Sequence, residues 1–364
     1  MKVIISGGGT GGHIYPAIAI ANALKAMHEN VEILFVGANG RMEMEKVPQA
    51  GYKIMGLPIA GFQRRITIKN LILPFKIIAS MRKAAKIIRV FNPDVVVGVG
   101  GYASGPILKA AQRAKVPTVL QEQNSYAGMT NKMLAKEASA ICVAYDDMHR
   151  FFPKEKLNIT GNPVRKDIKV RDLSQVQARK FLALDPQKKT ILLFGGSLGA
   201  RTLNEAMKEN ASLISERSDV QIVWQAGKNN FESYRTCATA ALEHVTCTAF
   251  LNDMDKAYAA ADLVICRAGA LTISELCIVG KPSILVPSPH VAEDHQTMNA
   301  MALVNQHAAQ IIADVDAKSK LLKEAYELID SKKGLELLGN QIKKLGRPDA
   351  VDKIVKIITS VSKN

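Results

Sequence analysis

Short runs of apolar residues alternate with longer stretches of helical periodicity along most of the chain. Residues 3–6 are apolar enough for a buried strand, a glycine-rich turn follows, and residues 16–27 repeat apolar positions at helical spacing. Pro16 suits the first turn of that helix, and residues 31–36 form the next strand. Strands that alternate with helices in this order predict parallel α/β sheets.

The same order begins again near the middle of the chain. Residues 190–194 predict a strand, residues 195–199 a glycine turn, and a helix continues from Ala200. Residues 94–122 and 262–286 correspond in the same way, because each consists of a strand, a glycine turn, a helix, a proline and a further strand. The repeated order predicts two doubly wound units.

The chain is therefore predicted to be α/β, with two Rossmann-like domains, residues 1–162 and 163–344, that face each other across a cleft. The boundary falls near Gly161, and a polar helical segment over 174–184 leads into the second set of strands. The final segment, about 345–364, predicts an apolar-periodic helix that packs back on the first domain. In such sheets ligands bind beyond the carboxyl ends of the strands, where the glycine turns lie.

Composition supports two domains and no membrane-spanning segment. The chain has 364 residues, 48% hydrophobic and 22% charged, which is enough for two cores. Its N-terminus is expected to be a first strand rather than a signal peptide, and no stretch approaches the ~18 uninterrupted apolar residues of a membrane span. The cysteines are odd in number and lack a C-x-x-C pair, so we expect them to be reduced and mostly buried in a cytoplasmic protein: Cys142, Cys237, Cys247, Cys266 and Cys277.

Positive charge is concentrated in the first half of the chain. The net charge is +15, and residues 46–93 contain no Asp or Glu, which predicts nucleic acid, an anionic membrane surface or a phosphorylated substrate as partner. Residues 66–78 interleave apolar side chains with Lys69 and Lys76, and a basic helix follows over 75–90. We expect a membrane-facing surface, since no aromatic-rich stacking surface accompanies these charges as nucleic acid would require. The alternative is an ordinary amphipathic helix with a solvated basic face.

The first glycine turn has the spacing of a dinucleotide fingerprint. Gly7, Gly9 and Gly12 satisfy G-x-G-x-x-G between a strand and a helix. The fingerprint also needs an acidic residue at the end of the second strand, but Glu32 lies at the start of that strand. A Walker P-loop is excluded because neither Gly-Lys pair precedes Ser or Thr. Two interpretations remain open: room for a substrate beside His13, or a tight turn with a helix-capping histidine.

Six motifs are individually weak and together specific. In chain order they are residues 8–13 (GGTGGH), 121–124 (QEQN) with Gly128, 161–165 (GNPVR), 195–200 (GGSLGA), 267–275 (RAGALTISE) and 295–300 (HQTMNA). Over nearly the whole chain this set resembles the lipid II-forming UDP-N-acetylglucosamine transferases of glycosyltransferase family 28. The resemblance implies a GT-B fold and an inverting hexosyltransferase of peptidoglycan synthesis. Such an enzyme moves GlcNAc from UDP-GlcNAc to the C4 hydroxyl of MurNAc in undecaprenyl-diphospho-MurNAc-pentapeptide (lipid I).

The resemblance implies a donor site in the second domain. The Glu275 carboxylate can accept both ribose hydroxyls, and the helix N-terminus before it suits a diphosphate, since N–H groups and the helix dipole favour anions. Arg165 can pair with phosphate oxygens, and Gln296 with the GlcNAc hydroxyls. The plainer alternatives are a solvated helix glutamate and an interdomain ion pair of Arg165. The predicted UDP-GlcNAc-binding residues are Thr10, Gly11, Gly12, Asn124, Arg165, Ser197, Leu251, Ala270, Leu271, Thr272, Glu275, His295 and Gln296, with uracil bound by backbone groups near Leu251.

The acceptor hydroxyl must lose a proton as it attacks C1 of the donor sugar. His13 is the predicted base, with binding of an acceptor phosphate as the alternative. Glu122 and Asn124, at the end of a first-domain strand, are predicted to orient the acceptor. Residues 253–255 and 314–316 match the weak D-x-D metal pattern, but we expect helix termini and arginine to neutralise the leaving diphosphate. No metal or cofactor is then required, and Mg²⁺ is at most stimulatory.

The resemblance also implies a peripheral enzyme at the cytoplasmic face of the cell membrane, where its lipid-linked acceptor is found. The side chains predicted to contact the membrane are Ile68, Leu71, Ile72, Leu73, Phe75 and Lys76. The expected partners are UDP-GlcNAc, lipid I, an anionic membrane surface and other cell-wall synthesis or division proteins, but no nucleic acid.

Three other functions remain open. A GT-B transferase with a different lipid acceptor, such as diacylglycerol, would differ in its acceptor loops, where residues 100–106 and 121–124 favour lipid I. A UDP-sugar epimerase would need additional carboxylates in the cleft and would leave the basic apolar segment unexplained. A non-catalytic membrane adaptor would not need the set of donor-site motifs.

Overall fold

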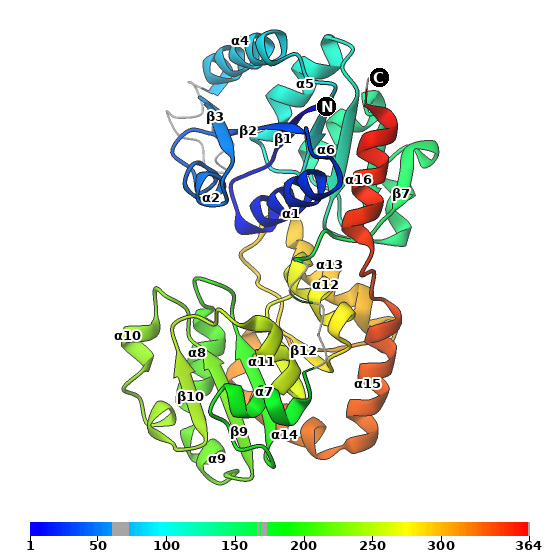
Figure 1. Cartoon of the computed structure of the whole chain (residues 1–364). Helices are drawn as coiled ribbons and strands as arrows, with labels where there is room; N and C mark the ends of the chain where they lie inside the picture. Colours follow the sequence, from blue (N-terminus) through cyan, green and yellow to red (C-terminus); the bar gives the residue numbers. More distant parts are fainter. Residues whose placement is uncertain (60–72, 166–167, 169–172, 363–364) are drawn as a thin grey trace. The chain divides into compact units, whose positions relative to one another are not determined.

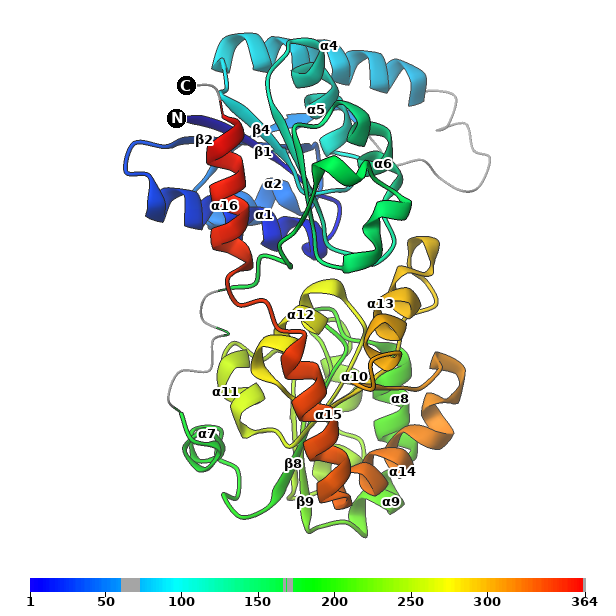
Figure 2. The same cartoon turned by 90° about the vertical axis from the view of Figure 1, so that its right-hand side faces the viewer.

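The computed structural model describes residues 1–59, 73–165, 168 and 173–362. The chain divides into two compact units. Unit 1 comprises Met1–Val164 and Asp349–Asn364, and unit 2 comprises Arg165–Pro348. Each unit has one parallel sheet with helices on both faces (Figures 1 and 2). The chain is therefore α/β with two Rossmann-like units, as predicted.

Unit 1 is built on a parallel sheet with the strand order β3-β2-β1-β4-β5-β6-β7. The order reverses direction between β1 and β4, so the loops at the carboxyl ends of these two strands mark the place where such sheets bind ligands. The strands are β1 Lys2–Ser6, β2 Glu32–Ala38, β3 Lys53–Leu57, β4 Val95–Gly98, β5 Thr118–Glu122, β6 Ala140–Val143 and β7 Leu157–Ile159.

Alternating side chains of these strands contact different layers of helices. Val3 and Ile5 of β1 pack in one core with α1 and α16, whereas Ile4 packs in another core with α4 and α5. The last helix thus lies against the first, where the His28 ring and the Thr359 hydroxyl are 3.0 Å apart. The helices are α1 Gly11–Met27, α2 Glu43–Gln49, α4 Leu73–Phe91, α5 Ser104–Arg113, α6 Met129–Leu134 and α16 Ala350–Val361, with 3-10 turns η1 Ala135–Glu137, η2 Asp146–Arg150 and η3 Lys154–Lys156.

Helix α1 begins earlier than the sequence predicted. Its first residue is Gly11, so Pro16 lies inside the helix and the expectation of Pro16 in the first turn is wrong. Thr10 is the N-cap in an extended conformation, and the glycines after it have no side chains to oppose the first turn. Pro16 removes one intrahelical hydrogen bond and its ring crowds the preceding turn, a cost that burial of Pro16 and its neighbours on this helix offsets.

Unit 2 repeats this construction with the strand order β10-β9-β8-β11-β12-β13, all parallel. Its order reverses direction between β8 and β11, which take the places of β1 and β4. The predicted restart of the strand–turn–helix pattern is therefore confirmed. The strands are β8 Lys189–Phe194, β9 Val220–Gln225, β10 Val245–Thr248, β11 Leu263–Cys266, β12 Ser283–Leu285 and β13 Gln310–Ile311.

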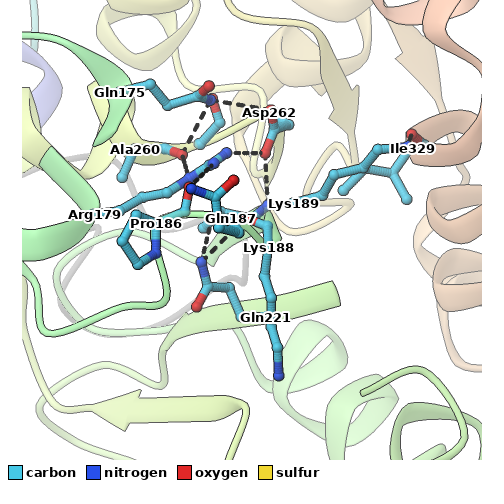
Figure 3. A network of polar contacts seen from close by, with 12 residues as sticks. Gln175, Arg179, Pro186, Gln187, Lys188, Lys189, Gln221, Ala260, Asp262 and Ile329 are labelled. Carbon is cyan, nitrogen blue, oxygen red and sulfur yellow. Dashed lines mark hydrogen bonds and ion pairs between the residues drawn. The ribbon is translucent and has the colours of Figure 1, made fainter. Parts of the chain in front are cut away.

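Helices α8 and α14 pack on one face of this sheet, while α11 packs against β8 and α7 against α11. Helix α7 starts with a capping box at Ser174, and its buried Arg179 reaches Asp262 at 2.6 Å (Figure 3). The helices are α7 Gln175–Phe181, α8 Arg201–Glu209, α9 Ala211–Ser215, α10 Phe231–Tyr234, α11 Met254–Ala260, α12 Ala270–Val279, α13 His295–Val304, α14 Ala317–Asp330 and α15 Lys332–Lys344, with 3-10 turns η5 Thr239–Ala241, η6 Ala292–Asp294 and η7 Asp314–Asp316.

Two sequence expectations concern the whole chain. In the part that the structure describes, no helix is both long and apolar enough to cross a membrane. All five cysteines are free thiols, and Cys142, Cys266 and Cys277 are buried. Burial raises the pKa of the Cys142 and Cys277 thiols to about 12, so neither is a nucleophile at neutral pH.

Candidate active site

The first glycine turn, residues 7–12, connects β1 to α1 at the carboxyl edge of the unit 1 sheet. A buried carboxylate from α2 holds it: Glu43 accepts hydrogen bonds from the Gly9 and Ala38 N–H groups, both at 3.0 Å. A Cβ on Gly8 would lie 2.2 Å from Glu43 Oε1, so the turn can approach the carboxylate only as glycine. Sequence reasoning missed Glu43, because Gly9 and Glu43 are far apart in the chain.

His13 lies in the first turn of α1 with one ring nitrogen held by the glycine turn. Its Nδ1 is 3.1 Å from the Gly8 carbonyl and 3.3 Å from Thr10 Oγ1. A carbonyl only accepts, so Nδ1 donates to Gly8 and the neutral ring carries its lone pair on Nε2. A Cβ on Gly100 would lie 3.0 Å from Nε2, and Gly100 has φ +91. A side chain at position 100 would therefore press against the His13 ring, so this position requires glycine.

Glu122 ends β5 and organises the loop that follows. Its Oε1 accepts from the Asn124 N–H at 3.1 Å, and its Oε2 accepts from the Gly128 N–H at 3.0 Å and Asn131 Nδ2 at 2.9 Å. The Asn124 side chain also donates to Oε1 at 3.3 Å. Because the carboxylate is buried and accepts four hydrogen bonds from the following loop and from α6, its geometry is that of a group that positions Asn124.

Buried amides connect two of the sequence motifs in unit 1. Gln121 Nε2 donates to Asn162 Oδ1, and Asn162 Nδ2 donates to the Gln123 carbonyl, both at 3.0 Å. Gln123 Nε2 donates to the Val99 carbonyl at 2.8 Å, in the strand end just before Gly100. The QEQN and GNPVR motifs are thus parts of one polar core at the carboxyl ends of β4 and β5.

In unit 2, Glu275 lies on α12 with its carboxylate fixed from two sides. Oε2 accepts from the Tyr258 hydroxyl at 3.0 Å, and Oε1 is 3.9 Å from Arg165 Nε. Burial and the neighbouring Glu275 raise the pKa of Tyr258 well above its usual value, so the hydroxyl stays a neutral donor. Only 14% of the Glu275 side chain is exposed, so it is not a solvated helix glutamate.

The first turn of α12 is suited to an anion. Gly269 is its N-cap and has no side chain with which to cap the helix, and the first turn contains no acidic residue. Ala270, Leu271 and Thr272 form that turn, as predicted from the sequence. The N–H groups of a helix's first turn and the positive end of the helix dipole both favour a phosphate.

The second glycine turn, residues 195–199, takes the place in unit 2 that the first turn has in unit 1. Gly196 has φ +89 and Gly199 has φ +83, and a Cβ on Gly199 would lie 2.0 Å from the Ala226 carbonyl. Ser197 is exposed at the tip of this turn. The turn is held by Gln225, a residue that sequence reasoning missed, and no motif around it gave a signal.

His295 and Gln296 begin α13 directly after a strained segment. Glu293 and Asp294 have φ +56 and +48, a conformation that non-glycine residues seldom adopt and that recurs at functional sites. Gln296 Oε1 accepts from the Ser288 N–H at 2.8 Å, which fixes the side chain against the loop after β12. Because Gln296 Oε1 faces the Ser288 N–H, Gln296 Nε2 points away from that loop.

The acidic residues of the two D-x-D patterns have basic partners. Lys256 pairs with Asp253 and is 4.0 Å from Asp255. Arg267 pairs with Asp314, and Lys320 is 3.2 Å from Asp316. Among the described residues, no group of three His, Cys, Asp or Glu side chains is arranged to hold a metal ion.

The predicted membrane residues are only partly described. Ile68, Leu71 and Ile72 lie outside the described residues, and Leu73 is the first residue of α4. Phe75 is 73% exposed and Lys76 is exposed as well. Two further apolar side chains of the same helix, Ile77 and Ile78, are also exposed.

Two Rossmann-like units, one with a histidine beside a glycine turn and one with a largely buried glutamate on the helix after a strand, are the arrangement expected of a GT-B fold. Two family models match in chain order: the glycosyltransferase family 28 N-terminal domain over residues 3–143 and the C-terminal domain over residues 190–354. The chain belongs to glycosyltransferase family 28.

Curated relatives carry one name. A protein of Bacteroides fragilis is 53% identical over 364 residues, which cover 100% of this chain and 96% of the relative. A protein of Cytophaga hutchinsonii is 51% identical over 360 residues, covering 99% of this chain and 96% of the relative. Each is named UDP-N-acetylglucosamine–N-acetylmuramyl-(pentapeptide) pyrophosphoryl-undecaprenol N-acetylglucosamine transferase.

Solved structures agree with this placement. The chain is similar to the crystal structure of MurG from Acinetobacter baumannii, with a TM-score of 0.80, 28% identity and 99% of each chain covered. A protein of Listeria monocytogenes described as a UDP-N-acetylglucosamine 2-epimerase gives a TM-score of 0.70 at 16% identity, covering 99% of this chain and 96% of that chain. The latter similarity shows the fold alone.

Proposed function

We propose that this chain transfers GlcNAc from UDP-GlcNAc to the C4 hydroxyl of MurNAc in lipid I, with inversion at C1, and so forms lipid II for peptidoglycan. The observation that carries this proposal is the 53% identity over the full chain to a relative with that name. The same name favours lipid I over diacylglycerol as acceptor. The epimerases share the fold at low identity, and the full-length relatives are transferases.

The donor is assigned to unit 2. Glu275, which Tyr258 holds in place, accepts the two ribose hydroxyls, and uracil lies against the backbone near Leu251. The first turn of α12 and the turn around Ser197 bind the diphosphate through backbone N–H groups, with Arg165 as a charged partner. Gln296 and His295 bind the GlcNAc hydroxyls.

The acceptor is assigned to unit 1, where His13 is the base. The C4 hydroxyl oxygen of MurNAc attacks C1 of GlcNAc, its proton passes to His13 Nε2, and the bond from C1 to the UDP oxygen breaks with its electron pair on the diphosphate. The geometry supports this role because Nδ1 donates to Gly8 and leaves the lone pair on Nε2. Glu122 positions Asn124, which orients the acceptor sugar. Thr10, Gly11, Gly12 and Asn124 also contact the GlcNAc part of the donor.

The leaving diphosphate is stabilised without a metal ion. The helix N-terminus and arginine supply positive potential where negative charge develops. The carboxylates of both D-x-D patterns are engaged with lysine or arginine, which supports this route over metal ligation. Mg²⁺ is at most stimulatory.

The enzyme acts as a peripheral protein at the cytoplasmic face of the membrane. Phe75 is exposed on α4 beside Lys76 and is followed by Arg82 and Lys86, a combination suited to an anionic lipid surface. Phe75→Ser should reduce binding to vesicles with anionic lipid about tenfold, because a phenyl ring no longer leaves water. Val315→Ser is the control in co-sedimentation, because Val315 is an apolar side chain in unit 2 that is even more exposed than Phe75. Equal loss in both variants would contradict the assignment.

The reaction is tested by incubating the purified protein with radiolabelled UDP-GlcNAc and a short-chain lipid I analogue in EDTA. Disaccharide product is expected, and none with diacylglycerol as acceptor. Product only after Mg²⁺ is restored would overturn the metal-free mechanism alone. Lack of product under both conditions would overturn lipid I as acceptor.

A further inference from the structure

Gln225 is a buried amide between two segments of the proposed donor site. It is the last residue of β9, only 3% exposed, and its Cα is paired with Phe194 of β8 on one side and Thr248 of β10 on the other. The second glycine turn follows β8, and the loop with Leu251 follows β10. One side chain on the middle strand thus lies between the loops that follow both of its neighbours.

The side chain uses both ends of its amide. Gln225 Nε2 donates to the Gly196 carbonyl at 3.0 Å, and Gln225 Oε1 accepts from the Leu251 N–H at 2.9 Å. The Gly196 carbonyl also accepts from the Gly199 N–H at 2.9 Å, so both of its lone pairs are engaged. A buried amide with both ends engaged holds these two loops at a fixed separation.

The hydrogen bond to Gly196 also sets the direction of the next N–H group. In a trans peptide the carbonyl of one residue and the N–H of the next point in opposite directions. Because the Gly196 carbonyl points to the buried Gln225, the Ser197 N–H points away from it. Within the described part of the chain, no residue accepts a hydrogen bond from the Ser197 N–H. This N–H is therefore available to a ligand oxygen on the exposed side of the turn.

We propose that Gln225 is a positioning residue that couples the uracil-binding loop to the diphosphate-binding turn. It contacts neither part of the donor, but its amide sets the separation of the two loops and directs the Ser197 N–H toward the diphosphate. This proposal rests on the assignment of UDP to unit 2 made above.

The same strand provides a matched control. Gln221 lies near the amino end of β9, is 4% exposed, and also uses both ends of its amide: Nε2 donates to the Asp185 carbonyl at 2.8 Å and Oε1 accepts from the Asp185 N–H at 3.0 Å. Figure 3 shows it beside Lys188, and its hydrogen bonds are to residues 185, 188 and 190 at the amino end of the strands. Gln225→Met and Gln221→Met each remove a buried amide with both ends engaged, at opposite ends of one strand, and Gln221 also donates to the Thr190 hydroxyl at 2.9 Å.

The test measures uridine and UDP affinity by calorimetry, with thermal unfolding alongside. Both methionine variants should lower Tm, Gln221→Met by at least as much as Gln225→Met. Only Gln225→Met should weaken UDP binding, by roughly 10- to 100-fold, since two ligand loops lose their fixed geometry. Gln221→Met should bind UDP within about twofold of the parent protein. Equal UDP affinity in the two variants would show that Gln225 is merely structural and overturn the proposal.

Gln225→Glu separates the two connections. It keeps an oxygen for the Leu251 N–H and loses the donor to Gly196, so uridine affinity should hold while the gain from uridine to UDP falls about tenfold. If Gln225→Glu weakened uridine and UDP binding by the same factor, the hydrogen bond to Gly196 would have no separate effect on the diphosphate, which contradicts the proposal. If the parent protein binds no UDP, the donor assignment itself fails. If it binds UDP and Gln225→Met is unchanged, only the role of Gln225 fails.

Discussion

The two glycine turns take equivalent places in the two units but are held by different chemistry. In unit 1 a carboxylate, Glu43, accepts from the Gly9 N–H and uses up a backbone donor. In unit 2 an amide, Gln225, donates to the Gly196 carbonyl and leaves the Ser197 N–H directed outward. The two equivalent turns therefore differ in one backbone N–H group. That of Gly9 is bound by a carboxylate inside unit 1, whereas that of Ser197 is directed away from the core of unit 2.

This difference explains how the same strand–turn–helix arrangement can serve diphosphate binding in one unit and proton transfer in the other. A turn that presents N–H groups beside the first turn of α12 suits a diphosphate. A turn backed by a carboxylate is a poor place for a further anion, but its Gly8 carbonyl fixes the tautomer of His13. The comparison supports the proposal that the nucleotide binds to unit 2 and that proton transfer takes place in unit 1.

The largest effect is expected from His13→Ala. If His13 is the base in unit 1, kcat should fall by roughly 10²- to 10⁴-fold while UDP affinity stays within about twofold. His13→Gln, which keeps a polar side chain without a titrating group, should not restore kcat. Steady-state transfer kinetics and UDP titration measure the two quantities. A rise in the UDP dissociation constant with unchanged kcat would reverse the assignment of roles.

Substitutions of Glu275 test the proposed donor site in unit 2. Glu275→Ala should raise KM for UDP-GlcNAc by roughly 10²-fold, because two hydrogen bonds to a carboxylate are lost, and should also leave the buried Tyr258 hydroxyl without its acceptor, at about 1–3 kcal/mol of stability. Glu275→Gln keeps an acceptor for Tyr258, so Tm should recover while KM remains raised about tenfold. The account fails here if KM follows Tm in both variants.

A smaller effect on kcat is expected from a substitution of Glu43, which holds the first glycine turn. In Glu43→Gln an NH₂ group faces either the Gly9 or the Ala38 N–H, which should lower the free energy of unfolding by about 1–3 kcal/mol and reduce kcat several-fold. UDP affinity should be unchanged. Glu45→Gln, on the exposed side of the same helix, is the control for denaturant unfolding and kinetics. Loss of UDP affinity in Glu43→Gln would mean that the first turn also binds the UDP part of the donor.

The smallest effect concerns the far end of α12. Lys281 donates to the Ala259 and Ala261 carbonyls at 3.3 and 2.6 Å, and so connects the end of α11, which carries Tyr258, to the end of α12. Burial lowers the pKa of Lys281 to about 8, whereas in the unfolded chain it is about 10.4. Between these values the unfolded chain binds more protons, so the contribution of Lys281 to stability rises with pH.

Lys281→Met removes this titration. The free energy of unfolding of the parent protein, relative to that of the variant, should therefore rise by about 1–3 kcal/mol between pH 7.5 and 10. Urea unfolding of both proteins at several pH values measures it. Parallel pH dependences would show that Lys281 is not the titrating group.

The elements of both units could be predicted from sequence because their signals are local. Apolar runs, glycine turns and periodic helices gave the strand–turn–helix order, and motifs such as residues 267–275 placed Glu275 behind a helix start. The start of α1 was missed, since Pro16 is a strong local signal and Gly11 is a weak one.

Glu43 and Gln225 could not be found in this way. Each acts on backbone groups of other strands' loops, at sequence separations of 34, 29 and 26 residues. A single buried polar residue at the end of an apolar strand has the same sequence appearance whether it fills a core position or holds a ligand loop. Only the strand order, which brings β9 between β8 and β10, distinguishes the two.

Backbone amide hydrogen exchange with and without UDP tests the division of roles most directly, because it reports on each glycine turn in the unmodified protein. UDP should slow exchange in the second glycine turn, around Ser197, and in the first turn of α12, and should leave residues 8–12 unchanged. Slowing in residues 8–12 without slowing around Ser197 would contradict the placement of the nucleotide in unit 2.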